Sequence, residues 1–173
     1  MPRADRTAAG TRWLLGVLFA CSVVPRAQAD ADFKSASDAQ IGQTVLSYPR
    51  SSLQIQSASG RQDFDVQIAD TSERQELGLM FVMSLLPDRG MLFPVSPPRA
   101  MTMWMKNTFI PLDMLFIDAH WRIVCLRERT RPRSLDLISC DQPVSAVVEI
   151  AGGEAAARRI RIGDTVTYPA PRG

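Results

Sequence analysis

Histidine and cysteine are scarce in this chain of 173 residues, which contains one histidine and three cysteines. A single histidine, His120, and widely separated cysteines do not provide the cluster of donors that a zinc site needs. The sequence also lacks a G-x-S-x-G motif and a C-x-x-C motif, so nothing supports a serine hydrolase or a thioredoxin-like redox pair. A catalytic cysteine–histidine pair, formed by His120 with Cys125 or Cys140, is conceivable, but no third residue that would orient the histidine is evident.

Apolar runs long enough to cross a bilayer, which takes about 20 residues, are missing as well. The apolar run from Trp13 to Val24 is shorter; arginines precede it, and Ala27-Gln28-Ala29 follows it. This order predicts a secretory signal peptide over residues 1–29, cleaved before Asp30. We therefore expect an exported protein, periplasmic or secreted, with no transmembrane segment in its mature part. The alternative is a lipoprotein anchored at Cys21, because LFAC is similar to a lipoprotein box.

An excess of charge of one sign is missing from the predicted mature chain. The whole sequence has 20 Lys+Arg and 18 Asp+Glu, and removing the leader's four arginines and one aspartate leaves 16 basic and 17 acidic residues. This near balance gives no reason to expect a nucleic-acid partner. A local exception is a group of arginines that either lies along a solvated strand edge or forms an anion-binding patch: Arg122, Arg127, Arg129, Arg131 and Arg133.

Composition divides the mature chain into an arm, a domain and a tail. Residues 30–59 are polar and have no sustained periodicity, which predicts a flexible N-terminal arm. Two short strand-like pieces, 41–49 and 52–56, lie within this arm. An ordered domain is predicted over residues 60–168, followed by a tail of residues 169–173.

Within the domain, short alternating segments are separated by turn residues. Asp63–Ala69 alternates strictly, and a helix is predicted to begin at Asp70–Ser72 and to end at Gly78. A second short helix follows Gly152-Gly153, a weak candidate for an anion site. Further strands are predicted over 91–95, 101–108, 112–118, 121–129 and 143–151, and residues 160–168 are predicted to supply a Gly-Asp turn and a last strand. Because the helices are too few to cover a parallel sheet, we predict a mainly β fold, a compact β-sandwich or a jelly-roll-like or barrel-like domain with two short helices.

The strand predicted from Met101 to Thr108 alternates between methionines on one face and other residues on the opposite face. Thioethers are ligands that Cu(I) prefers. One hypothesis is therefore a periplasmic Cu(I) binder, and its ligands would be Met101, Met103, Met105 and His120. The alternative is that the methionines form the inner, core-facing side of the strand. No other cofactor is expected.

Two carboxylates occur in apolar segments. Asp113 stands at the start of one predicted strand and Glu149 inside another. Either carboxylate could be the general acid or base of a hydrolase. For Glu149, the alternation is also compatible with partial exposure and with a structural pairing to Lys106 or Arg74.

Cys125 and Cys140 remain once the leader is removed, in a compartment where disulfides persist. They are either bonded to each other or two buried thiols that behave as small apolar residues. Both alternatives stay open, because a disulfide needs Cα atoms within about 7 Å and spacing alone does not give that distance.

Four segments occur together in the order and spacing of a known family: ERQELGLMFVMSLLPDRGMLF, WMKNTFIPLDMLFID, AVVEIAGG and IRIGDTV. The region from Phe64 to Tyr168 resembles the bacterial and archaeal domain-of-unknown-function family numbered 192, and Trp104 to Asp113 is its most specific part. The resemblance implies a compact, mostly β domain with small helices and no established activity. It also implies that a shared site would be lined by Arg74, Gly78, Met80, Trp104, Lys106, Asn107, Asp113 and Glu149. Met101, Met103 and Cys140 depart from the family pattern, so copper binding would be a property of this chain alone.

The signature itself suggests a ligand site. Tryptophan offers a stacking surface, while lysine and asparagine offer directional polar contacts, a combination that suits a small polar or glycan-like ligand. The site residues would be Arg74, Trp104, Lys106, Asn107 and Asp113. In the architectural alternative, Asn107 holds a turn and Lys106 pairs with Glu149 or Asp113. The function hypotheses are an exported binding or accessory module first, a hydrolase that uses Asp113 or Glu149 second, and a Cu(I) binder third.

Overall fold

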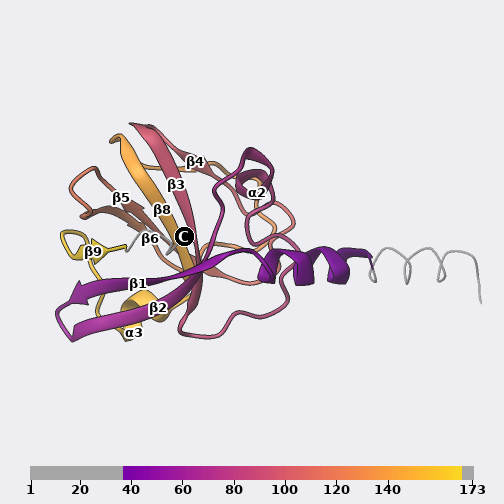
Figure 1. Ribbon diagram of the computed structural model, residues 1–173, viewed down its shortest axis with the longest axis horizontal. Helices are drawn as coiled ribbons and strands as arrows, with labels where there is room; N and C mark the ends of the chain where they lie inside the picture. The colour runs from indigo at the N-terminus through magenta and orange to yellow at the C-terminus, as the bar shows by residue number, and fades with distance from the viewer. Residues whose placement is uncertain (1–36, 169–173) are drawn as a thin grey trace, which may run out of the picture.

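The computed structural model describes residues 37–168, so the predicted signal peptide, Cys21, the first residues of the predicted arm and the tail at 169–173 lie outside the described residues. Residues 37–46 are helical. The later elements are β1 (Arg50–Ser57), β2 (Gly60–Ile68), α2 (Ser72–Leu77), β3 (Arg89–Arg99), β4 (Thr102–Met103), β5 (Leu112–Ile117), β6 (Ile123–Arg127), β7 (Ile138–Ser139), β8 (Val144–Ala151), α3 (Glu154–Ala157) and β9 (Thr165–Thr167). Figure 1 shows these elements along the chain.

Seven strands form one sheet in the order β6-β5-β8-β3-β2-β1-β9, and β4 pairs with β7 in a separate two-stranded ribbon. Neighbouring strands of the large sheet are antiparallel, with the exception of β2 and β3. That parallel pair is joined by a connection that contains α2, because parallel strands cannot be linked by a tight turn. The β5–β6 hairpin confirms the predicted pairing of these two segments.

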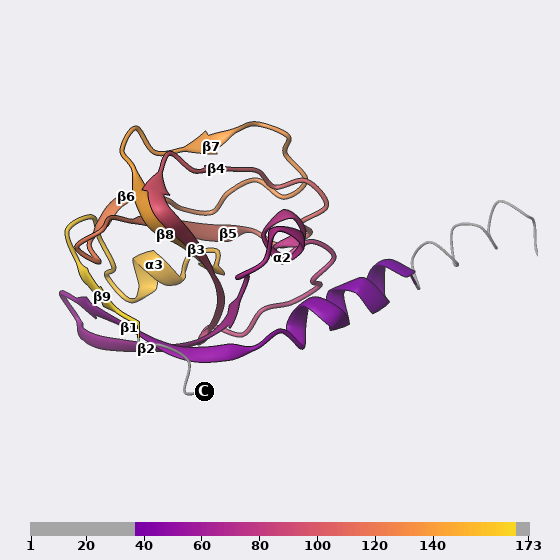
Figure 2. The same cartoon turned by 45° about the horizontal axis from the view of Figure 1, so that its top comes forward.

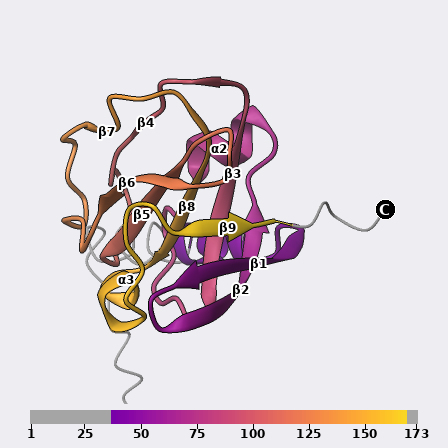
Figure 3. The same ribbon diagram turned by 90° about the vertical axis from the view of Figure 1, so that its left-hand side faces the viewer.

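The large sheet curls until its two edges meet. Arg122, just before β6, forms an antiparallel bridge with Thr165 of β9. The Val166 N–H donates to the Trp121 carbonyl at 2.8 Å across the same junction. Figure 3 shows β9 beside β1, with α3 at one end of the curl. The predicted mainly β, barrel-like fold is confirmed, and its short helices are peripheral.

Two apolar clusters lie on opposite faces of the central strands. The inner cluster draws residues from β1, β2, β3, β5, β6, β8, β9 and α3, as expected for the inside of a curled sheet. The outer cluster covers the other face of β3, β5 and β8 and includes residues of β4 and of the segment around α2. Figure 2 shows β4 and β7 on the side of β3 and β8 that faces away from β1 and β2. The central strands are therefore buried on both faces, which explains why LDMLFI and VSAVVEIA read as nearly continuous apolar runs.

The sheet begins earlier in the chain than residue 60. Residues 50–57, placed within the predicted arm, form the full strand β1, which pairs with both β2 and β9. The strand-like piece at 52–56 thus lies in a strand, whereas most of the piece at 41–49 is helical. Helix 37–46 packs on the body through Val45, which is fully buried. Gly42 is buried as well, and a Cβ there would lie 2.3 Å from the Phe81 carbonyl oxygen, so the helix lies close against the chain that leaves α2.

The predicted strand over 101–108 is wrong in extent. Only Thr102 and Met103 belong to β4, and the chain turns at Lys106 and Asn107, where the Thr108 N–H donates to the Met105 carbonyl at 3.0 Å. The alternation of burial nevertheless persists: Met103 and Met105 are buried, while Thr102, Trp104 and Lys106 are exposed. Side chains thus continue to alternate between buried and exposed after the β4 hydrogen bonds end at Met103, because the chain stays extended until it turns at Lys106.

Candidate functional site

A pocket of about 410 Å³ opens between α2 and the turn that follows β4. Its lining comes from two separated stretches of the chain: Glu73, Glu76, Leu77, Met80, Phe81, Trp104, Lys106 and Asn107. Its volume lies within the usual range of small-molecule sites. We call it the α2–Trp104 pocket.

Local sequence explains the α2 wall. The Thr71 side chain caps the helix by accepting a hydrogen bond from the Arg74 N–H, and Glu73 lies in the first turn, where a negative charge is favourable. The helix ends at Gly78, whose φ of 50° is costly for other residues. A Cβ at this position would also lie 3.3 Å from the Phe93 ring, so Gly78 lets α2 approach the sheet closely. The predicted start and end of this helix are confirmed.

The opposite wall is the turn at residues 104–107. The Phe81 N–H donates to the Asn107 carbonyl at 2.9 Å, which ties this turn to the chain leaving α2. Both residues have positive φ, 63° for Phe81 and 54° for Asn107. Such backbone is costly outside glycine and tends to concentrate at functional sites. The Lys106 Nζ lies 5.0 Å from the centroid of the Trp104 ring, a cation–π contact.

A smaller inner space of about 20 Å³ adjoins this pocket, and we call it the inner space. It shares four lining residues with the pocket, Glu76, Leu77, Met80 and Trp104, and Glu149 of β8 lies at its floor together with Phe93, Met103 and Thr108. About 10–15 Å³ suffices for one water molecule, so a single water or a group of that size fits.

Glu149 is a buried and uncompensated carboxyl group. Its side chain is only 3% exposed, and its Oε2 has no hydrogen-bond partner in the described chain. Its register neighbours are Met91 of β3 and Met114 of β5, both fully buried. Desolvation by this apolar surrounding raises the pKa of Glu149 to about 8. The residue is therefore mostly a neutral carboxylic acid at pH 7, and the expected partial exposure and pairing with Lys106 or Arg74 are wrong.

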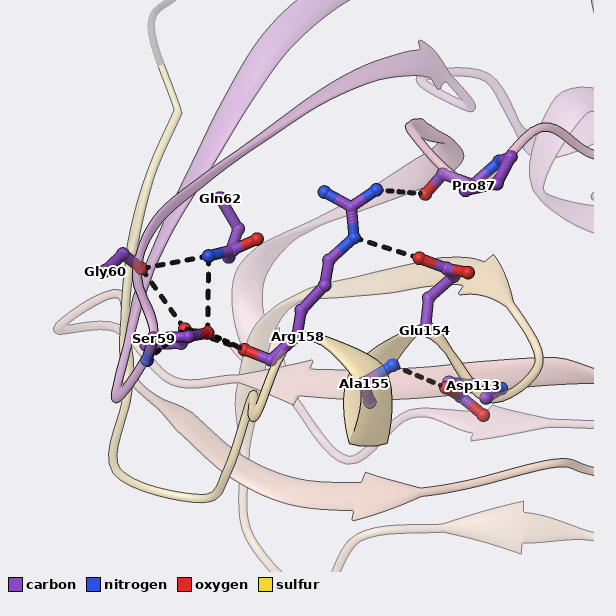
Figure 4. A network of polar contacts seen from close by, with 10 residues as sticks. Ser59, Gly60, Gln62, Pro87, Asp113, Glu154, Ala155 and Arg158 are labelled. Atoms are coloured by element: carbon purple, nitrogen blue, oxygen red, sulfur yellow. Dashed lines mark hydrogen bonds and ion pairs between the residues drawn. The ribbon is translucent and has the colours of Figure 1, made fainter.

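Asp113 lies elsewhere and serves the fold. Its carboxylate is fully buried and accepts hydrogen bonds from the N–H groups of Arg129 at 2.7 Å, Gly153 at 2.9 Å and Ala155 at 2.8 Å. Figure 4 shows Asp113 beside α3, joined by a dashed line to the Ala155 nitrogen. The anion site considered at Gly152-Gly153 is thus filled by the chain's own carboxylate. Asp113 does not line the α2–Trp104 pocket.

Arg74 also lies outside the pocket lining. Its guanidinium pairs with Asp70, one helical turn earlier, and lies over the Tyr48 ring at 5.0 Å. It thereby attaches α2 to the chain that enters β1. Of the eight positions implied by the family resemblance, the structure brings six together around the pocket and the inner space: Gly78, Met80, Trp104, Lys106, Asn107 and Glu149.

The three methionines considered for copper pack in or against the outer apolar cluster, of which His120 is not a member. Met103 and Met105 are buried in the outer apolar cluster, and Met101 packs against it. The Met105 Sδ accepts a hydrogen bond from the Thr130 hydroxyl at 3.1 Å. His120 is in the β5–β6 turn, where its side chain is 85% exposed and faces Asp118. Among the described residues, there is no cluster of three or more His, Cys, Asp or Glu side chains that could hold a metal ion.

The two remaining cysteines form a disulfide between Cys125 of β6 and Cys140, with their Cα atoms 6.0 Å apart. It closes the loop that carries most of the arginine group. Arg122 and Arg127 donate to the carbonyls of Gly163 and Ser139, and Arg133 lies over the Phe109 ring at 4.8 Å. These arginines thus make contacts within the fold.

Sequence reasoning missed the acidic wall of the pocket. The sequence pattern singles out neither the two glutamates of α2 that line it, Glu73 and Glu76, nor Phe81. Glu76 lines both the pocket and the inner space. The period of α2 could have signalled it, since Glu73 and Glu76 are three residues apart and share one helical face.

Comparison with solved structures finds two similar bacterial proteins. One, from Sinorhizobium meliloti 1021, is provisionally described as a transcription regulator; it is 36% identical, with a TM-score of 0.68, and the match covers 70% of this chain and 95% of that one. The other is a protein of unknown function from Novosphingobium aromaticivorans DSM 12444; it is also 36% identical, with a TM-score of 0.68, and the match covers 69% and 86% of the two chains. No curated protein matches the chain.

Residues 54–168 match the sequence model of one protein family, and this span holds α2, the Trp104 turn and Glu149. The match extends over β2 to β9 and the second half of β1, so it includes nearly the whole curled sheet. It agrees with the resemblance carried by the four sequence segments. The chain belongs to the family DUF192, described as "Uncharacterized ACR".

Proposed function

We propose that this protein is an exported binding or accessory module for a small polar, glycan-like ligand, held in the α2–Trp104 pocket. The observation that carries the proposal is the convergence of three separated segments on two adjoining hollows: α2 and the Trp104–Asn107 turn line the pocket, and Glu149 of β8 lines the inner space. Trp104 is 39% exposed, so its ring is available for stacking on a sugar ring. Lys106 and Asn107 supply polar groups at the rim.

Export is supported by the disulfide, because disulfides persist in oxidising compartments and are rare in the cytosol. Among residues 37–168, no helix has the length and apolarity that crossing a membrane requires. Fractionation of cells that express the tagged protein, with and without residues 1–29, tests export. Retention of the full-length protein in the cytosol would contradict it.

Nucleic-acid binding is not part of the proposal. The predicted mature chain has 16 basic and 17 acidic residues once the leader's four arginines and one aspartate are subtracted from totals of 20 and 18. The description of one similar structure as a transcription regulator is therefore not extended to this chain.

A glycan panel screened by thermal shift, followed by titration calorimetry, tests ligand binding. We expect at least one glycan to raise the melting temperature of the wild type and to have no effect on Trp104→Ala. The matched control is Leu137→Ala, which removes an apolar side chain that is 73% exposed and lines a different hollow. Loss of binding in the control, with binding kept in Trp104→Ala, would move the site away from this pocket.

The second candidate is a hydrolase in which Glu149 acts as the general acid. The observation that favours it is the raised pKa of this buried carboxyl group, which keeps a proton available near pH 7. Asp113 is the weaker candidate because three backbone N–H groups already occupy its carboxylate. Measuring the release of hydrolysis products from the same glycans separates the two functions. Turnover that is abolished by Glu149→Gln would identify an enzyme. Binding without turnover supports the binding module.

A further inference from the structure

We propose that the α2–Trp104 pocket selects a ligand with a primary ammonium group, and that an amino sugar is the class of ligand that fits it. The inference rests on the proposed function and adds the sign of charge that the site requires. It draws on the acidic wall of α2, the Trp104 ring and the unpartnered carboxyl group of Glu149.

The charges around the pocket favour a cation. Glu73 and Glu76 face it from α2, and Lys106 is the single basic residue of its lining. The Glu73 carboxylate is occupied by hydrogen bonds at the start of α2, which lower its pKa, so it remains charged. Glu76 is exposed and makes no ion pair or hydrogen bond with other described residues. One carboxylate thus remains without a counter-charge, facing both the pocket and the inner space.

The Trp104 ring provides the second element. An ammonium group already lies over it, since the Lys106 Nζ is 5.0 Å from the ring centroid. Aromatic faces attract cations electrostatically, and tryptophan does so most strongly. The protein's own lysine therefore shows where an ammonium group is stable, and a ligand ammonium can bind between this ring and Glu76.

Glu149 provides an observation independent of the acidic wall. Its carboxyl group is nearly fully buried, one oxygen has no hydrogen-bond partner, and the adjoining space admits only a group about as large as one water. A buried carboxyl oxygen without a hydrogen-bond partner is costly, so a hydroxyl or ammonium group that enters the space and donates to the carbonyl oxygen of Glu149 is stabilised. Glu76 of α2 is the other titratable residue of that lining; the β3 and β5 neighbours of Glu149 are Met91 and Met114, which carry no charge.

A pair of matched sugars tests the inference by titration calorimetry with the purified protein. The glucosamine tetramer carries free amines, whereas the N-acetylglucosamine tetramer has similar rings without the charge. At mildly acidic pH, where the amines are protonated, we expect the glucosamine tetramer to bind roughly tenfold more tightly. This preference should shrink as salt is added, because exposed charges are screened.

Two variants locate the charge effect. Glu76→Gln should remove the preference for the amine, since the unpartnered carboxylate becomes a neutral amide. Glu128→Gln, an exposed carboxylate that does not line this pocket, should leave the preference unchanged. A preference that survives Glu76→Gln, or equal affinity for the two tetramers, would overturn the charge inference.

The outcomes also separate this inference from the proposed function. If both tetramers bind equally well and Trp104→Ala abolishes this binding, the protein is a glycan-binding module that does not select amines. No binding of either tetramer, together with a flat response across the glycan panel, would reject both.

Discussion

The carboxylate of Asp113 accepts a hydrogen bond from the Ala155 N–H at 2.8 Å, so the start of β5 holds the first turn of α3 (Figure 4). The same carboxylate also receives the N–H groups of Gly153 and Arg129. A residue expected at a ligand site thus ties the start of β5 to two other backbone segments, one at Arg129 and one at Gly153–Ala155.

Replacing Asp113 with alanine should therefore destabilise the fold strongly. Three N–H groups would lose their partner in a buried place, and the expected cost is about 3 kcal/mol or more. Urea denaturation measures it, with Asp88→Ala, an exposed aspartate, as the control. A loss below about 1 kcal/mol would contradict the structural role of this carboxylate.

Glu149 should make stability depend on pH. Its pKa is about 8 in the folded protein and near 4.5 when solvated, so the unfolded chain releases the proton first. The protonated group makes its full contribution to the free energy of unfolding below pH 4.5. This contribution is lost as the pH rises to about 8, at a rate of up to roughly 1.4 kcal/mol per pH unit. Glu149→Gln should remove this slope and be more stable than the wild type at pH 8.

Denaturation at several pH values between 4 and 9 checks that sign. Glu128→Gln is the matched control, because Glu128 is exposed and should leave the slope in place. An identical pH profile for the wild type and Glu149→Gln would show that the carboxyl group is solvated in the folded protein.

The disulfide should contribute about 3 kcal/mol to stability, as expected for a cross-link with a sequence separation of 15 residues. The double variant Cys125→Ala/Cys140→Ala should unfold at correspondingly lower urea concentration. A reductant should lower the stability of the wild type to a similar extent and leave the double variant unchanged. If the reductant also lowered the stability of the double variant, the loss seen in the wild type could not be assigned to the Cys125–Cys140 disulfide.

Met105 should behave as a core residue. It is fully buried in the outer cluster, so Met105→Ala should cost about 2–5 kcal/mol, whereas Met105→Leu should cost less than about 1.5 kcal/mol. Met101→Ala should cost less than Met105→Ala because Met101 is only partly buried. Thermal denaturation ranks the three variants, and equal stability of Met105→Ala and wild type would argue against the core assignment.

Much of the fold could be predicted because its signals are local. The caps of α2 at Thr71 and Gly78, the β5–β6 hairpin and the alternation in β2 each depend on residues within a few positions of one another. The same locality explains the failure at Lys106 and Asn107. The Phe81 N–H, from a distant segment, donates to the Asn107 carbonyl at this turn, and neither turn residue is a glycine or a proline.

The candidate site was predicted only in part, and the residues that failed show why. Trp104, Lys106 and Asn107 lie close together in the sequence and also meet in the pocket, whereas Arg74 and Asp113 each found a partner elsewhere. Sequence pattern cannot distinguish a polar residue that faces a ligand from one that binds a backbone N–H group, because the same residue types do both.

The sequence by itself determined the ends of α2, the β5–β6 hairpin and the alternation in β2, because alternation and capping act over a few residues. Only the tertiary structure decided that Glu149 is buried between Met91 and Met114 and that it faces the same space as Glu76 and Trp104. The physical reason is that desolvation and charge depend on neighbours from strands and helices that are distant along the chain.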